Sequence, residues 1–206
     1  QSRNGCHPRP PAHRCPGRPG YDLDSLLAVA VRVFNERGYD ATSMDVLAKN
    51  LGLTKSSIYH HVAGKEELLD LALNRALSGL FAVTTEAGAT TGRSVDRLEY
   101  VLRRSVEVLV AELPYVTLLL RVRGNSDVER RALARRREFD AVIADLVAGA
   151  VEEGDVRADA DPAVTSRLLF GMVNSLVEWY RPRPDHPVGE VADALVAIAF
   201  DGLRRN

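Results

Sequence analysis

Apolar side chains recur at three- and four-residue steps along most of this chain, the spacing that places them on one face of a helix. The first such stripe comprises Leu26, Leu27, Ala30, Val31 and Phe34. The helical pattern begins at Asp22, and Gly38 is a residue type that commonly ends helices. We therefore predict an amphipathic helix between these two residues.

Two short helices are predicted to follow. Thr42 is a good N-cap with Asp45 three residues later, and the helix that it opens should end near Gly52. Thr54 caps the next helix, which spans residues 55–62. The connection between these two helices is therefore only a few residues long.

The remaining pattern also indicates helices. One opens at residues 64–67 and runs through Leu80, and a stretch rich in Gly and Thr follows at 84–93. Five more helices are predicted over residues 94–112, 114–123, 127–153, 162–180 and 188–205. Because the sequence shows neither a solenoid repeat nor an alternation of strands and helices, we predict an all-α fold with nine helices in two groups.

Composition limits the class of protein. The 206 residues are 46% hydrophobic and 27% charged, which is typical of a soluble globular chain. The longest apolar runs, such as 26–31 and 194–200, are far shorter than the roughly 18–20 residues that span a bilayer. No apolar segment of the secretory-signal type opens the chain, so we expect a cytoplasmic protein without a membrane partner.

The first twenty residues differ from the rest. They are dense in Pro, Gly and Arg, so we predict a flexible arm over residues 1–20. Cys6, His7, His13 and Cys15 could form a four-ligand metal set, but their spacing is not a familiar zinc pattern and a Pro-rich segment does not orient ligands. We therefore predict no metal site, no disulfide framework and no cofactor.

The formal net charge of −1 is unevenly distributed. Residues 1–65 carry nine Lys and Arg against five Asp and Glu, whereas residues 66–206 carry eighteen against twenty-three. A polyanion would therefore bind at the N-terminal end. Arg14 and Arg18 of the arm could enter a minor groove, although a solvated tail is the favoured interpretation.

The segment 42–62 carries the strongest functional signal. Two short helices joined by a tight turn match a helix-turn-helix, whose second helix lies in the DNA major groove. In that second helix the side chains from Thr54 to Ser57 are small or cationic, and Lys55 can meet a phosphate or a guanine edge. Ile58 should point into the core. Tyr59 and His60 should face outward, towards DNA. The same sequence pattern would also fit a surface tyrosine and a helix-end histidine that have no role in DNA binding.

Three phrases then identify a family resemblance: F-x-E-x-G-Y-x-x-T-S, L-A-x-x-L-G-L-T-K-S-S-I-Y-H-H and G-K-E-E-L. Over residues 23–71 the chain resembles the DNA-binding domain of the tetracycline-repressor (TetR) family. The resemblance implies a DNA-binding domain at 21–66, an effector-binding and dimerisation domain at 67–206, and a homodimer on a palindromic operator. The implied DNA contacts, with Thr54 added from the argument above, are Thr42, Ser43, Thr54, Lys55, Ser56, Ser57, Tyr59, His60 and Lys65.

The last two predicted helices have apolar stripes wider than one neighbouring helix requires. The resemblance implies that this helix pair meets its two-fold mate in a four-helix bundle. Burial within one subunit would give the same pattern. The predicted dimer contacts are Leu169, Met172, Val173, Leu176, Val191, Leu195 and Ile198.

An effector pocket should combine apolar bulk with polar groups. The candidates are Phe81, Tyr100, Arg104, Tyr115, Leu119, Arg121, Phe139, Ile143, Phe170, Asn174, Glu178 and Trp179. Asn174 is the strongest, because a buried amide needs a hydrogen-bond partner that a ligand could supply. The arginines between 121 and 137 are either a solvated face or a site for an anionic ligand. The sensor region is similar to family members that respond to acyl-coenzyme A thioesters.

Two other classes of function are weaker. No catalytic triad, Cys–His pair, paired carboxylates or Gly-rich phosphate loop is visible, so the chain is not predicted to be an enzyme. A DNA-binding or scaffold protein without a ligand remains an alternative, which the absence of an apolar pocket would favour.

Overall fold

The computed structural model describes residues 22–183 and 186–203. All regular elements in these ranges are helices, apart from one isolated bridge between Arg183 and His186. The ten helices are α1 (Leu23–Arg37), α2 (Met44–Leu51), α3 (Lys55–Tyr59), α4 (Lys65–Val83), α5 (Ala87–Thr90), α6 (Ser94–Ala111), α7 (Leu113–Arg121), α8 (Asp127–Glu152), α9 (Pro162–Trp179) and α10 (Val188–Leu203). The all-α prediction is confirmed.

Two details of the prediction are wrong. The structure has one helix more than the nine predicted. This additional helix is α5, a single turn inside the stretch rich in Gly and Thr, where the sequence indicated only a connection. The N-cap of α2 is Ser43 and not Thr42, because the Ser43 hydroxyl accepts from the backbone N–H of Val46. The neighbouring Thr42 is buried and its hydroxyl donates to the carbonyl of Gly38.

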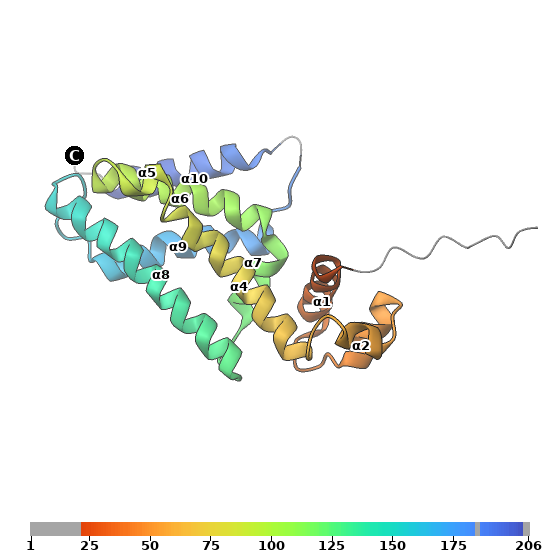
Figure 1. Cartoon of the computed structure of the whole chain (residues 1–206). Coiled ribbons are helices and arrows are strands. Elements are labelled where there is room, and N and C mark those ends of the chain that lie inside the picture. Colours follow the sequence, from red (N-terminus) through yellow and green to blue (C-terminus); the bar gives the residue numbers. More distant parts are fainter. Residues whose placement is uncertain (1–21, 184–185, 204–206) are drawn as a thin grey trace, which may run out of the picture.

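The helices α1, α2 and α3 form the first group, at one end of the molecule (Figure 1). Leu26, Phe34, Leu47 and Ile58 are buried between them. Gly52, which ends α2, has a φ of 64°, in the left-handed region that favours glycine. This turn leaves only three residues between the end of α2 and the start of α3, and the sequence predicted such a short connection.

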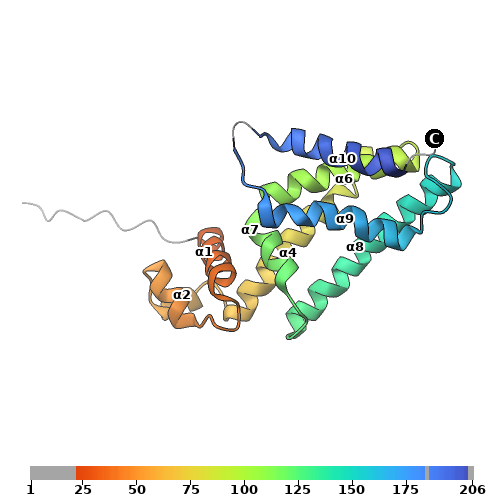
Figure 2. The same cartoon turned by 180° about the vertical axis from the view of Figure 1, so that it is seen from behind.

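The second group is a larger helical bundle, and α4 runs from the first group into it (Figures 1 and 2). The helix α6 packs against α8, α9 and α10, while α4 packs against α7 and α8. Leu73 and Leu77 of α4 and Leu98 and Leu102 of α6 are buried in this bundle. The helix α4 therefore packs against α1 of the first group as well as against the bundle.

Candidate DNA-binding surface and effector pocket

The short helix α3 presents a polar face to solvent. Ile58 is fully buried and holds the helix against the first core. Lys55, Ser56 and His60 are exposed, and Tyr59 keeps 50% of its surface accessible. The outward face therefore consists of hydrogen-bonding side chains and an aromatic ring that stand free of the core.

Hydrogen bonds at the start of α3 fix the backbone of this face. The Thr54 hydroxyl accepts from the Ser57 N–H at 3.2 Å and lies 2.9 Å from the Ser57 hydroxyl. The Lys55 ammonium pairs with the Asp45 carboxylate of α2 at 2.7 Å, and this hydrogen bond raises the pKa of Lys55. Both partners are solvent-accessible, so a phosphate can compete with Asp45 for the ammonium.

Two predicted DNA contacts point into the protein. The buried Thr42 hydroxyl is engaged by Gly38, so it is not positioned to reach a phosphate. The Lys65 ammonium donates to the carbonyls of Tyr39 and Thr42, at 3.1 Å each. In the subunit without DNA these two side chains therefore have partners within the protein, and their DNA contacts stay predictions. Ser43 is exposed and its hydroxyl caps α2.

The exposed apolar face of the bundle lies on α9 and α10. It consists of Val164, Leu168, Trp179 and Ile198, which keep more than half of their surface accessible in the subunit. Of the predicted dimer contacts only Ile198 belongs to this face, while Met172 and Val191 are half-buried. The other four are buried in the core of their own subunit, which leaves them little surface for a partner: Leu169, Val173, Leu176 and Leu195.

Four predicted effector contacts meet in the interior of the bundle. Leu119, Phe139, Phe170 and Asn174 line a cavity of about 30 Å³, which is roughly the volume of one water molecule. The rings of Phe139 and Phe170 meet edge to face at 5.0 Å, and the ring of Phe81 packs on Phe139 at 5.6 Å. Aromatic side chains therefore fill most of this interior site.

The other candidates are dispersed. Tyr100 and Arg104 both bind Glu86, next to α5. Tyr115 is buried beneath the guanidinium of Arg75. The remaining three are Arg121, whose guanidinium donates to the Asn35 carbonyl, Ile143, which is fully buried, and Glu178, which is exposed. These six residues do not line the cavity beside Phe139, and their role as effector contacts stays a prediction.

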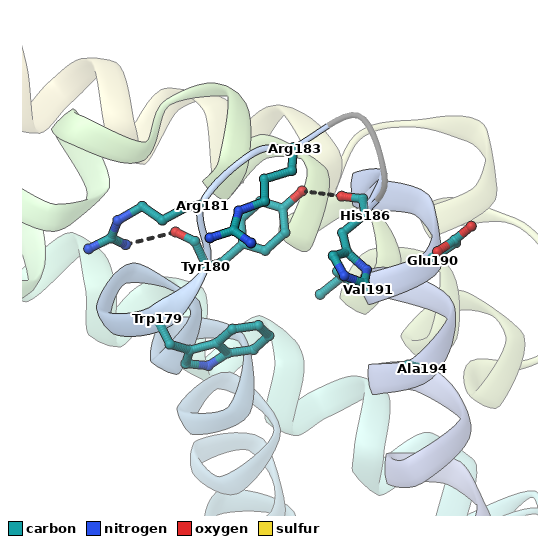
Figure 3. Close-up of a pocket in the computed structure, with 8 residues that line it drawn as sticks. All are labelled: Trp179, Tyr180, Arg181, Arg183, His186, Glu190, Val191 and Ala194. Carbon is teal, nitrogen blue, oxygen red and sulfur yellow. Dashed lines mark hydrogen bonds between the residues drawn. The ribbon is translucent and has the colours of Figure 1, made fainter.

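A larger hollow of about 490 Å³ opens where α9 ends and α10 begins (Figure 3). Its lining residues are Trp179, Tyr180, Arg181, Arg183, His186, Glu190, Val191 and Ala194. The Tyr180 hydroxyl donates to the His186 carbonyl at 3.0 Å, which holds the connecting segment over the pocket. Trp179 belongs both to this pocket and to the exposed apolar face.

This pocket combines an aromatic wall with cations. The exposed ring of Trp179 offers flat apolar surface, whereas Tyr180 is only 4% exposed. Arg181 and Arg183 offer guanidinium groups that bind carboxylate or phosphate. Only Trp179 was among the predicted effector contacts. The two arginines were missed because the R-P-R-P-D-H-P segment indicated only a connection, although the cations next to a tryptophan were a usable signal.

Several expectations concern other parts of the chain. Cys6, His7, His13 and Cys15, and the arm residues Arg14 and Arg18, lie outside the described residues. Within 22–183 and 186–203, no cluster of three or more His, Cys, Asp or Glu side chains could hold a metal ion. The helices in these ranges are also too short or too polar to cross a membrane.

Both groups of helices match domains of known proteins. Residues 26–72 match bacterial regulatory proteins of the tetR family, and residues 91–203 match the tetracyclin repressor-like C-terminal domain. The HTH-type transcriptional repressor KstR2 of Rhodococcus jostii (strain RHA1) is 30% identical over 203 residues, which cover 94% of this chain and 96% of that protein.

Solved structures agree with this result. SCO3833, a TetR-family transcriptional regulator from Streptomyces coelicolor A3, is 59% identical and superposes with a TM-score of 0.83 over 87% of this chain and 91% of that one. AibR, solved with isovaleryl coenzyme A and operator DNA, shares the fold at a TM-score of 0.74 and 24% identity, over 86% and 97% of the two chains. This chain belongs to the TetR family of helix-turn-helix transcription regulators, which are not enzymes.

Proposed function

We propose that this chain is a homodimeric, ligand-responsive repressor that binds a palindromic operator through residues 21–66 and senses an effector through residues 67–206. The observation that carries the proposal is the exposed polar face of α3, which Ile58 anchors and which no other described element covers. A regulator that reads base edges needs a helix of this kind in the major groove.

The exposed apolar face on α9 and α10 supports the homodimer. Four large apolar side chains are exposed on these two helices, and exposed apolar surface of this kind favours a protein interface. A two-fold dimer through this face would carry two copies of α3, and binding to one side of DNA requires that they lie roughly 34–36 Å apart. The name of the R. jostii relative as a repressor supports repression over activation.

The pocket between α9 and α10 supports an amphipathic, anionic effector. Acyl-coenzyme A thioesters combine an apolar chain, an adenine ring and phosphates, which match Trp179, Tyr180 and the two arginines. The isovaleryl coenzyme A bound to AibR belongs to the same class. The pocket and the apolar face share Trp179, so a ligand there would change the angle between the two subunits.

A repressor of this kind is tested with the DNA around its encoding gene. We expect the full chain to prefer a palindrome from that region over competitor DNA in a fluorescence anisotropy titration. Lys55→Met should weaken operator binding roughly ten-fold, because it removes a cation from each recognition helix. Lys49→Met, which removes an exposed cation from α2, is the matched control. Equal affinity for operator and competitor would contradict the proposed function.

The effector class has its own test. We expect isovaleryl coenzyme A or a longer acyl-coenzyme A to raise the melting temperature and to release operator DNA. Arg183→Ala should weaken that ligand about ten-fold and leave DNA affinity unchanged, because it removes a charge-assisted contact far from α3. Arg137→Ala, an exposed arginine on α8, should bind the ligand like the wild type. If no acyl-coenzyme A shifts melting, the effector belongs to another class.

A further inference from the structure

An ion pair joins the first turns of α2 and α3, the two helices of the helix-turn-helix. The Nζ atom of Lys55, the first residue of α3, lies 2.7 Å from Oδ1 of Asp45, the second residue of α2. The Lys55 side chain keeps 48% of its surface accessible and the Asp45 side chain keeps 72%. Because Lys55 belongs to the exposed polar face of α3, the Asp45 carboxylate lies beside that face.

The pairing leaves hydrogen-bonding capacity on both groups. An ammonium has three N–H donors, and a carboxylate has two acceptor oxygens. Among the residues that the structure describes, neither the Lys55 ammonium nor the second oxygen of Asp45 has another hydrogen-bond or ion-pair partner. The pair therefore presents two N–H donors next to one free acceptor oxygen.

This arrangement is complementary to the major-groove edge of a G·C base pair. Guanine presents O6 and N7 there as acceptors, and cytosine presents an N4–H donor. Because O6 and N4 hydrogen-bond to each other, they lie about 3 Å apart, which is close to the 2.7 Å between the Lys55 and Asp45 atoms. An A·T pair has an N6–H donor and an O4 acceptor in these places, so it would set donor against donor and acceptor against acceptor.

A base edge also suits this ion pair better than a phosphate does. A phosphate that binds the Lys55 ammonium brings a second negative charge towards the Asp45 carboxylate, and the two anions repel each other. A base edge carries no net charge and offers a donor to the carboxylate, so the ion pair stays intact when DNA binds. Residues at the N-terminal end of the second helix are also those that contact base edges in helix-turn-helix proteins.

We propose that Asp45 and Lys55 act together as a specificity determinant that reads one G·C base pair in each half of the operator. Lys55 donates to O6 and N7 of guanine. Asp45 accepts from N4 of cytosine and holds the ammonium in place. The inference rests on the proposed function, because it names the base pair that the helix-turn-helix selects.

Symmetric base-pair substitution in the operator tests this assignment. Each G·C pair of the half-site is replaced in turn by A·T in both halves of the palindrome, and fluorescence anisotropy gives the affinity at one salt concentration. For the wild type we expect one position at which the replacement weakens binding about a hundred-fold, which is about ten-fold in each half-site. For Asp45→Asn the loss at that position should fall to about ten-fold, because an amide can donate to O4 of thymine as well as accept from cytosine.

A control variant and a modified base complete the experiment. Asp40→Asn removes the same charge from an exposed position in the turn before α2, and it should keep the hundred-fold loss of the wild type. Replacing the guanine by 7-deazaguanine removes the N7 acceptor. This replacement should weaken operator binding by the wild type several-fold and leave the affinity of Lys55→Met unchanged, since that variant has no ammonium to donate.

The outcomes separate this proposal from the proposed function. The proposal is overturned if Asp45→Asn keeps the full loss at every G·C position, or if 7-deazaguanine weakens Lys55→Met as strongly as the wild type. The same holds for a wild type that prefers the operator but shows no sensitive G·C position. A wild type that does not prefer the operator over competitor DNA would overturn the proposed function as well.

Discussion

Replacing Leu168 and Ile198 together by glutamate is expected to convert the protein into a monomer and to weaken operator binding at least about a hundred-fold. In the isolated subunit these side chains keep 66% and 69% of their surface exposed. Burial of one such side chain contributes about 1.5–3 kcal/mol, and a two-fold interface counts each residue twice. The four glutamates would also repel one another across the interface.

Sedimentation equilibrium gives the mass of the variant, and anisotropy gives its affinity for a full operator and for a half-site. Because both positions face solvent in the subunit, helix content should remain that of the wild type. Ala134→Glu, which adds a charge at an exposed position of α8, is the matched control and should remain dimeric. A double variant that still sediments as a dimer with wild-type affinity would refute the assignment of this face.

The exposed apolar face on α9 and α10 shows what hydrophobic periodicity cannot predict. The helix α9 is apolar on two sides: Leu169, Val173 and Leu176 pack inside the subunit, while Val164 and Leu168 face outward. Periodicity identifies apolar stripes, but it does not say which stripe the protein's own core uses. The wide apolar stripe therefore includes an inner side and an exposed side, and four of the seven predicted dimer contacts lie on the inner side of their helices.

The helix-turn-helix was easier to predict because its signals are local. A threonine cap, a left-handed glycine and a buried isoleucine act within a few residues of one another, and the structure confirms Thr54, Gly52 and Ile58 in these roles. The partners that Thr42 and Lys65 have within the subunit were not predicted, for a different reason. Their partners are backbone carbonyls of the turn between α1 and α2, and a residue-type pattern does not show which carbonyls face a side chain.

The candidate effector pocket was the hardest feature to predict, because its lining depends on tertiary structure. Tyr100, Tyr115 and Phe139 all combine bulk with a location in the sensor helices, yet they lie in three separate environments. The larger pocket forms where a chain reversal brings Arg183 opposite α10. Only the path of the chain between α9 and α10 determines that arrangement.

The second large effect is expected at Glu129, a carboxylate near the start of α8 that is only 5% exposed. One of its oxygens accepts from the backbone N–H groups of Arg123, Gly124 and Asn125, at 2.8, 2.7 and 3.1 Å. Glu129→Gln should lower the free energy of unfolding by about 3 kcal/mol. The reason is that the three N–H groups would donate to a neutral amide oxygen, which is a weaker acceptor than the buried carboxylate. Denaturant titration at pH 7 measures this difference.

The same contacts predict the pH dependence. Burial raises the pKa of Glu129, but the three N–H donors outweigh it and hold the pKa below its ordinary value of 4.5. A carboxyl group with a lowered pKa in the folded state stabilises the protein above its unfolded pKa, and this contribution is lost as the pH falls through the folded pKa. The difference in unfolding free energy between wild type and Glu129→Gln should therefore be constant near neutrality and close progressively below about pH 4.5.

The control is Glu138→Gln, which replaces an exposed carboxylate on the same helix and should follow the wild-type curve throughout. If Glu129→Gln unfolds like the wild type at pH 7, the loop between α7 and α8 does not depend on this carboxylate.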